Sequence, residues 1–182
     1  AGGEPFFMKK ELLMLLNAIN NKSKVTVRIL TNVSVYDKDI VKKLKEFKKP
    51  KLYLSIDAVG RALEISRWKS NWNLLQENIQ KFKKDNFHLM LVPAIGVYTV
   101  SSLPDLLEWC TTNEIYSDVI FIQDPVHQVV NMIPEMDLRS IKEQIIQKFL
   151  GASIREKYVN YREVLEQLNF YIEKNYVNPN TI

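Results

Sequence analysis

The sequence predicts an α/β fold with a parallel sheet, and two observations support this prediction. Segments of strand character lie over residues 24–31, 52–57, 87–92 and 119–122. Segments with apolar residues at helical spacing separate them, over residues 8–20, 37–48, 71–84 and 103–111. This alternation is typical of β-α-β units, whose strands pair in parallel through right-handed crossovers.

Local signals support the individual elements. The segment 24–31 alternates apolar and polar residues, and 52–57 is a short apolar run typical of a buried strand. Asp37 is an expected N-cap for the helix over 37–48, and Pro50 ends that segment. The helix over 103–111 carries Pro104 in its first turn, where proline is tolerated.

The pattern changes after about residue 124, which predicts a C-terminal region of a different kind. Residues 129–133 form an apolar run that fits one further strand. Helices are then expected over 135–150 and 155–174, with Gly151 as a C-cap between them and a frayed tail over 175–182. We therefore predict two parts, residues 1–125 with the sheet and residues 126–182 as a mostly helical extension.

Composition is that of a globular protein without a membrane span. The chain has 182 residues, 46% of them hydrophobic and 25% charged, and no apolar run approaches the roughly 18 residues that a span needs. The net charge of +4 lies in short lysine clusters, which we interpret as solvated helix faces and not as a nucleic-acid site. Cys110 is the only cysteine, so we expect a reduced, cytoplasmic protein and a buried structural thiol.

The first residues, Gly2-Gly3-Glu4-Pro5, form a motif with two interpretations. As a plain loop, the glycines permit unusual backbone angles and the proline begins a helix. In a binding site, the glycines let the backbone approach a ligand, and the glutamate accepts hydrogen bonds from an ammonium group.

Polar residues also follow the predicted strands. Thr31-Asn32 ends the segment 24–31, and Ser55 and Asp57 end the next strand, two positions apart and therefore on the same side. Ligands of parallel α/β folds bind at the carboxyl ends of strands. The structural alternatives are a helix-start turn at Thr31-Asn32 and an N-cap at Asp57.

Arg67 is a further candidate. Its guanidinium suits a ligand carboxylate through a bidentate fork, but Glu64 lies three positions before it and offers a surface ion pair instead. His88 and His127, the only histidines, give too weak a signal to assign a metal site.

These motifs, in this order, resemble the radical S-adenosylmethionine (SAM) enzymes, in the part that follows their iron–sulfur loop. In that family Gly-Gly-Glu-Pro contacts the amino group of SAM, and Thr-Asn-Gly and Ser-Ile-Asp-Gly follow; here Val33 and Ala58 replace the glycines. The resemblance covers about residues 1–125 and is greatest to a twitch/SPASM-like subgroup. It implies the C-terminal part of a partial (β/α)6 radical SAM barrel with a parallel sheet, plus C-terminal helices.

The resemblance also implies SAM as cofactor and a set of contacts to it. Ser55 would contact SAM, Asp57 would lie near the substrate or ribose, and Arg67 would hold the SAM carboxylate. Val97 or Tyr98 would line the adenine, with a core role as the alternative. The implied cofactor-binding residues are Gly2, Gly3, Glu4, Pro5, Thr31, Asn32, Ser55, Asp57, Arg67 and Val97.

The family binds a [4Fe–4S] cluster through three cysteines of a C-x3-C-x2-C loop and cleaves SAM there to a 5′-deoxyadenosyl radical. This chain has one cysteine and begins within a motif and without Met, so we expect a fragment that is inert alone, with the cluster only in the intact parent. Expected partners are a missing N-terminal segment or second chain and a substrate, peptide or sugar. The alternative is a non-catalytic α/β binding or scaffold module; no catalytic residue is assigned.

Overall fold

The protein has an α/β fold, as the sequence predicts. The computed structural model describes residues 3–149 and 157–174 and divides the chain into two compact units. The first unit holds residues 1–55 and 69–90, and the second holds residues 56–68 and 91–182. These compact units have other boundaries than the predicted parts, residues 1–125 and 126–182, and do not test that division. The division therefore stays a prediction.

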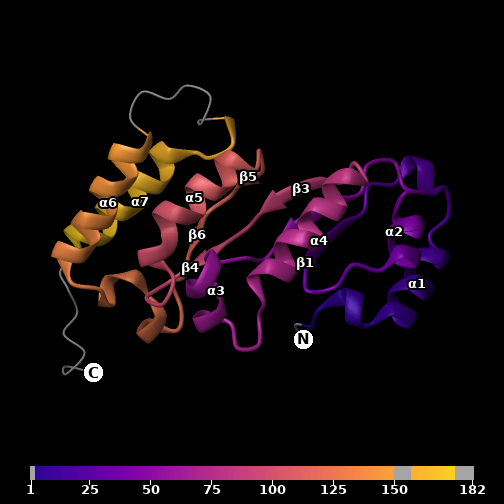
Figure 1. The fold of residues 1–182 in the computed structure, drawn as a ribbon, viewed down its shortest axis with the longest axis horizontal. Helices are drawn as coiled ribbons and strands as arrows, with labels where there is room; N and C mark the ends of the chain where they lie inside the picture. Colours follow the sequence, from indigo (N-terminus) through magenta and orange to yellow (C-terminus); the bar gives the residue numbers. More distant parts are fainter. Residues whose placement is uncertain (1–2, 150–156, 175–182) are drawn as a thin grey trace. The chain divides into compact units, whose positions relative to one another are not determined.

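The first unit contains a parallel sheet with helices. Its strands are β1 (Arg28–Thr31) and β3 (His88–Leu91, whose last residue belongs to the second unit), both labelled in Figure 1, and β2 (Lys51–Leu54). In the hydrogen-bonded order of the sheet, β2 lies between β1 and β3. Strands β1 and β2 pair in parallel, with Ile29 opposite Leu52 and Thr31 opposite Leu54. Its helices are η1 (Pro5–Phe7), α1 (Lys9–Ala18), η2 (Lys22–Lys24), α2 (Lys38–Leu44) and α4 (Trp72–Lys84).

Capping residues fix two of these helices where the sequence predicts them. The Asp37 carboxylate accepts hydrogen bonds from the backbone N–H groups of Asp39 and Ile40, and Asn71 caps α4 through Leu74. Helix α2 ends at Leu44, short of the predicted residue 48. The backbone N–H of Lys48 donates instead to the carbonyl of Val25 (3.0 Å), which turns the chain toward β2.

Aromatic side chains form the centre of this unit. Phe82 of α4 is fully buried, and Phe6, Tyr36 and Phe87 meet its ring edge-on, with centroids 5.0 to 5.7 Å away. Such edge-to-face pairs contribute beyond the apolar area that they bury. The cluster links the segment before α1 to α4 and to the start of β3.

Three polar residues, Tyr36, Asp85 and Lys45, interact at the edge of this cluster, and we expect them to make the stability of the fold decrease at alkaline pH. The Tyr36 hydroxyl donates to Asp85, and Lys45 Nζ lies 2.5 Å from the same carboxylate. The hydrogen bond to Asp85, with burial second, raises the pKa of Tyr36 to about 12. The Lys45 ammonium and the Tyr36 hydroxyl hold the pKa of Asp85 below its ordinary value.

We therefore expect Tyr36 to stabilise the fold below about pH 10, its pKa when unfolded, and to lose that effect as the pH rises toward 12. A Tyr36→Phe variant should be less stable at neutral pH, and the difference from the parent should narrow between pH 10 and 12. Urea unfolding followed by circular dichroism across this range measures the difference. A difference in stability between the parent and Tyr36→Phe that stays constant up to pH 12 would contradict the raised pKa of Tyr36.

The second unit contains short strands and most of the C-terminal helices. Strand β4 (Ala94–Ile95) pairs in parallel with β6 (Ile120–Phe121), and the backbone of Asp118, just after β5 (Tyr116–Ser117), donates to the carbonyl of Leu91 (2.9 Å). The helices are α3 (Gly60–Ser66), η3 (Val100–Ser102), α5 (Leu103–Thr112), η4 (Val126–Gln128), η5 (Val130–Met132), α6 (Glu135–Phe149) and α7 (Tyr161–Glu173).

Several expectations for this unit are wrong. The apolar run over residues 129–133 is a 3-10 turn, not a strand: the N–H groups of Met132 and Ile133 donate three residues back along the chain. Helix α3 and strand β5 were not predicted. Helix α7 begins at Tyr161, later than residue 155, because the Asn160 side chain caps it.

Other expectations lie outside the described residues or concern exposure. The Gly151 C-cap and the tail over 175–182 fall on residues that the structure does not describe. His88, expected to be half-buried, is exposed at the start of β3. Among the described residues, no helix combines the length and apolar character needed to cross a bilayer.

Candidate functional site

Glu4 joins the Gly-Gly-Glu-Pro motif to the carboxyl end of β1. Its Oε1 accepts hydrogen bonds from Thr31 Oγ1 (2.7 Å) and from the backbone N–H of Phe6 (3.1 Å). Its Oε2 accepts from the backbone N–H of Asn32 (2.6 Å). The sequence predicted Glu4, Thr31 and Asn32 as members of one site, and the structure brings these three residues together within the first unit.

The turn that follows β1 is held by further hydrogen bonds. Thr31 is buried and its Oγ1 accepts from the N–H of Val33, while Asn32 Oδ1 accepts from Ser34. Val33 has a φ of 62°, in the left-handed region that favours glycine, although its side chain is fully buried. Asn78 of α4 donates to the Val33 carbonyl (2.9 Å) and fixes this strained residue.

Ser55, Pro5 and the two glycines are the other predicted site residues of the first unit. The backbone N–H of Ser55 donates to the Thr31 carbonyl (2.9 Å), so the ends of β1 and β2 are adjacent. Gly3 is exposed, and a Cβ added there would meet no atom within 4 Å. Pro5 begins η1 directly after Glu4, which caps that turn. Gly2 lies outside the described residues.

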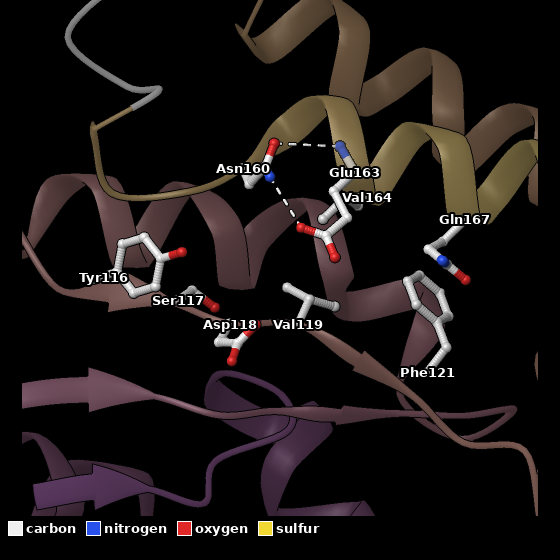
Figure 2. A pocket seen from close by; sticks show the side chains of 9 residues that line it. All are labelled: Tyr116, Ser117, Asp118, Val119, Phe121, Asn160, Glu163, Val164 and Gln167. Carbon is white, nitrogen blue, oxygen red and sulfur yellow. Dashed lines mark hydrogen bonds between the residues drawn. The ribbon is translucent and has the colours of Figure 1, made fainter.

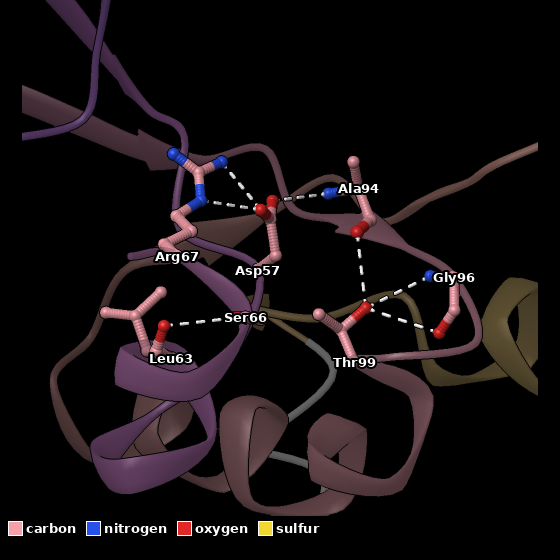
Figure 3. A network of polar contacts seen from close by, with 7 residues as sticks. All are labelled: Asp57, Leu63, Ser66, Arg67, Ala94, Gly96 and Thr99. Atoms are coloured by element: carbon pink, nitrogen blue, oxygen red, sulfur yellow. Dashed lines mark hydrogen bonds and ion pairs between the residues drawn. The ribbon is translucent and has the colours of Figure 1, made fainter. Parts of the chain in front are cut away.

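Asp57 and Arg67 form an ion pair within the second unit (Figure 3). The Asp57 Oδ2 accepts from Arg67 Nε (2.8 Å) and Nη2 (2.6 Å), and its Oδ1 accepts from the backbone N–H of Ala94 (2.9 Å). Asp57 is 9% exposed, and it does not cap α3, whose N-cap is Val59. The sequence offered a ligand carboxylate or Glu64 as partners of Arg67 and did not predict Asp57.

The loop after β4 packs closely around Gly96. Thr99 Oγ1 accepts from the Gly96 N–H (3.0 Å), and the N–H of Val97 donates to the Gln128 carbonyl (3.0 Å). A Cβ on Gly96 would lie 2.5 Å from that carbonyl oxygen, so glycine is required here by close approach. Val97 is half-buried, whereas Tyr98 is 71% exposed and has no core role.

A small hollow of the second unit lies between the β5–β6 segment and the start of α7 (Figure 2). Two of its polar residues, Asn160 and Glu163, are engaged in capping α7: Asn160 Oδ1 accepts from the Glu163 N–H (3.3 Å), and Asn160 Nδ2 donates to Glu163 Oε2 (2.9 Å). None of the site residues predicted from the sequence lines this hollow. We therefore assign it a structural role.

The described residues provide no metal centre. They contain no group of three or more histidine, cysteine, aspartate or glutamate side chains placed to hold an ion. Cys110 is fully buried in α5, as predicted, and burial raises the pKa of its thiol to about 12.

Because of this burial, Cys110 should not react with Ellman's reagent at pH 8 in the folded protein. In denaturing guanidinium chloride the same thiol should react completely, and the chain has no other cysteine to confuse the signal. Absorbance at 412 nm reports both reactions. Rapid release of one equivalent of thionitrobenzoate from the native protein would contradict the burial of the Cys110 thiol.

Comparison with known proteins gives structural neighbours only. No protein-family model matches the chain, and no curated protein matches it. Solved structures do match: anSMEcpe with bound AdoMet and Cp18Cys peptide has a TM-score of 0.63 and 15% identity, over 90% of this chain and 49% of that chain. A second structure of anSMEcpe with bound AdoMet has a TM-score of 0.64 and 16% identity, over 88% and 46%.

A further neighbour is SuiB of Streptococcus suis bound to S-adenosylmethionine. It has a TM-score of 0.56 and 17% identity, over 86% of this chain and 40% of that chain. The chain thus spans less than half the length of these proteins. At this identity the likeness shows the fold, and it confirms the prediction of an α/β fold like part of a radical SAM barrel.

Proposed function

We propose that the chain forms part of the SAM-binding wall of a radical SAM enzyme. The observation that carries this proposal is the network of Glu4 with Thr31 and Asn32, at the carboxyl end of β1. Strand ends are where parallel α/β folds bind ligands. The neighbours with this fold hold AdoMet, which supports the same ligand class for this chain.

The donors and acceptors of the first unit suit the ammonium end of SAM. A carboxylate has about four acceptor positions, and that of Glu4 fills three of them by accepting from Phe6, Thr31 and Asn32. The fourth suits an ammonium N–H. The open space at Gly3 lets a ligand approach the backbone. Glu4 therefore has two roles in this proposal: it holds the motif against β1, and it contacts SAM.

Arg67 fits its expected role less simply. Its Nε and Nη2 groups donate to Asp57, so the buried carboxylate of this chain already engages one edge of the guanidinium that the resemblance assigns to the SAM carboxylate. We propose that Asp57 orients Arg67 and is not itself a contact to the ribose. Val97, half-buried beside Gly96, remains the proposed adenine contact.

A [4Fe–4S] cluster does not fit the residues of this chain. Such clusters need several thiolates, and Cys110 is a single, fully buried thiol. With bound SAM, the cluster would supply the reductive chemistry, and its thiolates would have to come from polypeptide other than these residues. We propose that the chain alone is inert, that its parent is cytoplasmic, and that the parent acts on a peptide, as the peptide bound to one neighbour suggests.

Isothermal titration of the chain with SAM tests the proposal. Glu4→Gln should weaken binding by about ten- to a hundredfold, as expected for a lost charge-assisted hydrogen bond, and Ser55→Ala by about fivefold. Glu11→Gln and Ser23→Ala, which change exposed residues of the same unit in the same way, are the matched controls.

The second candidate is a non-catalytic α/β binding or scaffold module, which the single inaccessible thiol favours. No SAM binding by the chain, or binding that is indifferent to both site variants, would select this module over the enzyme. Equal losses in the site variants and their controls would also exclude the proposed contacts.

A further inference from the structure

One face of the sheet in the first unit is basic at one end. Strand alternation places the odd residues of β1 and the even residues of β2 on the buried face, where Ile29, Leu52 and Leu54 lie. Among the described residues of these three strands, the opposite face carries no acidic side chain. Its residues are Arg28 and Leu30 from β1, Lys51 and Tyr53 from β2, and His88 and Met90 from β3.

Arg28 and Lys51 are direct partners across β1 and β2 on this face. Neighbouring strands are about 4.8 Å apart, and like charges placed directly opposite each other destabilise a sheet. Among residues 3–149 and 157–174, the structure gives neither side chain a hydrogen bond or ion pair. A local arrangement that opposes folding without an evident compensation is typical of a functional site.

An apolar and an aromatic residue follow Arg28 and Lys51 on the same face, two positions further along β1 and β2. Leu30, 57% exposed, lies opposite the half-buried Tyr53, each two positions beyond the charged residue of its own strand. Two residues along a strand span about 6.7 Å. The face therefore offers two cations at one end and, within the length of a small molecule, an open apolar surface.

We propose that Arg28 and Lys51 bind the phosphate group of a phosphate monoester whose apolar or aromatic part lies over Leu30 and Tyr53. Two adjacent cations match the charge of a phosphate monoester, near −2 at pH 7, and a guanidinium matches its oxygens in a bidentate fork. The site is distinct from the proposed SAM contacts: Asn32 and Ser55 directly follow the ends of β1 and β2, four positions beyond Arg28 and Lys51 and therefore about 13 Å away. It does not depend on the proposed function.

Titration of the full chain with phenyl phosphate, followed by NMR of backbone amides, tests the site. Phenyl phosphate should bind at least fivefold more tightly than inorganic phosphate, which lacks the ring, and than benzoate, which carries one charge. The double variant Arg28→Gln/Lys51→Gln should weaken binding at least tenfold. The control Lys42→Gln/Lys49→Gln removes the same charge from exposed lysines of the same unit and should stay within twofold.

A second measurement separates binding from a structural role. Without ligand, Arg28→Gln should raise the urea midpoint of unfolding, because it removes a like-charge contact. A lower midpoint would show that Arg28 stabilises the fold and would overturn the proposal. The proposal is overturned by absence of phenyl phosphate binding, by equal losses in the two double variants, or by equal binding of benzoate. Equal binding of inorganic phosphate would overturn the role of Leu30 and Tyr53.

Discussion

Replacement of Gly96 by alanine is expected to lower the free energy of unfolding by about 2–4 kcal/mol. The added Cβ would lie 2.5 Å from the Gln128 carbonyl oxygen and 2.9 Å from Ile122 Cδ1. A side chain can rotate away, but the carbonyl belongs to the backbone. Relief of the clash therefore has to displace the Gln128 segment and weaken the hydrogen bond from the Val97 N–H to that same oxygen.

Urea unfolding followed by circular dichroism measures this loss, and Gly3→Ala is its matched control. A Cβ at Gly3 meets no atom within 4 Å, so that variant should stay within about 0.5 kcal/mol of the parent. Equal stability of the two variants would show that the loop after β4 is not packed as described.

The second large effect is expected at Asp57. Asp57→Ala removes the acceptor of two Arg67 hydrogen bonds and of the Ala94 N–H. Asp57 is 9% exposed, so its loss leaves the guanidinium and a backbone donor partly buried without this carboxylate. We expect a loss of about 2–4 kcal/mol, somewhat below a fully buried pair because the Arg67 side chain is 31% exposed.

Urea unfolding of Asp57→Ala, Arg67→Met and the double variant gives the interaction free energy between the two side chains, apart from the effect of each side chain alone. If the two residues act together, the double variant should lose clearly less than the sum of the single losses. Glu135→Ala breaks an exposed ion pair with Arg139 and should cost at most about 1 kcal/mol. A loss at Asp57 no larger than at Glu135 would rule out a structural role for the buried pair.

The loss at Asp57 also bears on the proposed function. If Asp57 orients Arg67 toward SAM, Asp57→Ala should weaken SAM binding under conditions where the variant remains folded. An effect on stability alone would leave the pair as a structural feature of the second unit.

Much of the first unit could be predicted from its sequence because local signals and tertiary packing agree there. Asp37 and Asn71 cap α2 and α4 as side-chain chemistry favours, and alternating apolar residues give β1 and β2 one buried face. The grouping of Glu4 with Thr31 and Asn32 was implied by the resemblance to radical SAM enzymes, and the position of Thr31 and Asn32 at a strand end agreed with it. In the second unit, strands of two residues, such as β5, are too short to carry a period.

The sequence alone determined the α/β class, the order of the main strands and helices, and the residues worth testing at the strand ends. These follow from period, capping and turn chemistry, which act between neighbours in the chain. Only the tertiary structure decided which donor meets which acceptor: that Arg67 pairs with Asp57, and that Gly96 is needed against Gln128. Such contacts join residues 10 and 32 positions apart, and a guanidinium or a glycine carries no local signal of its partner.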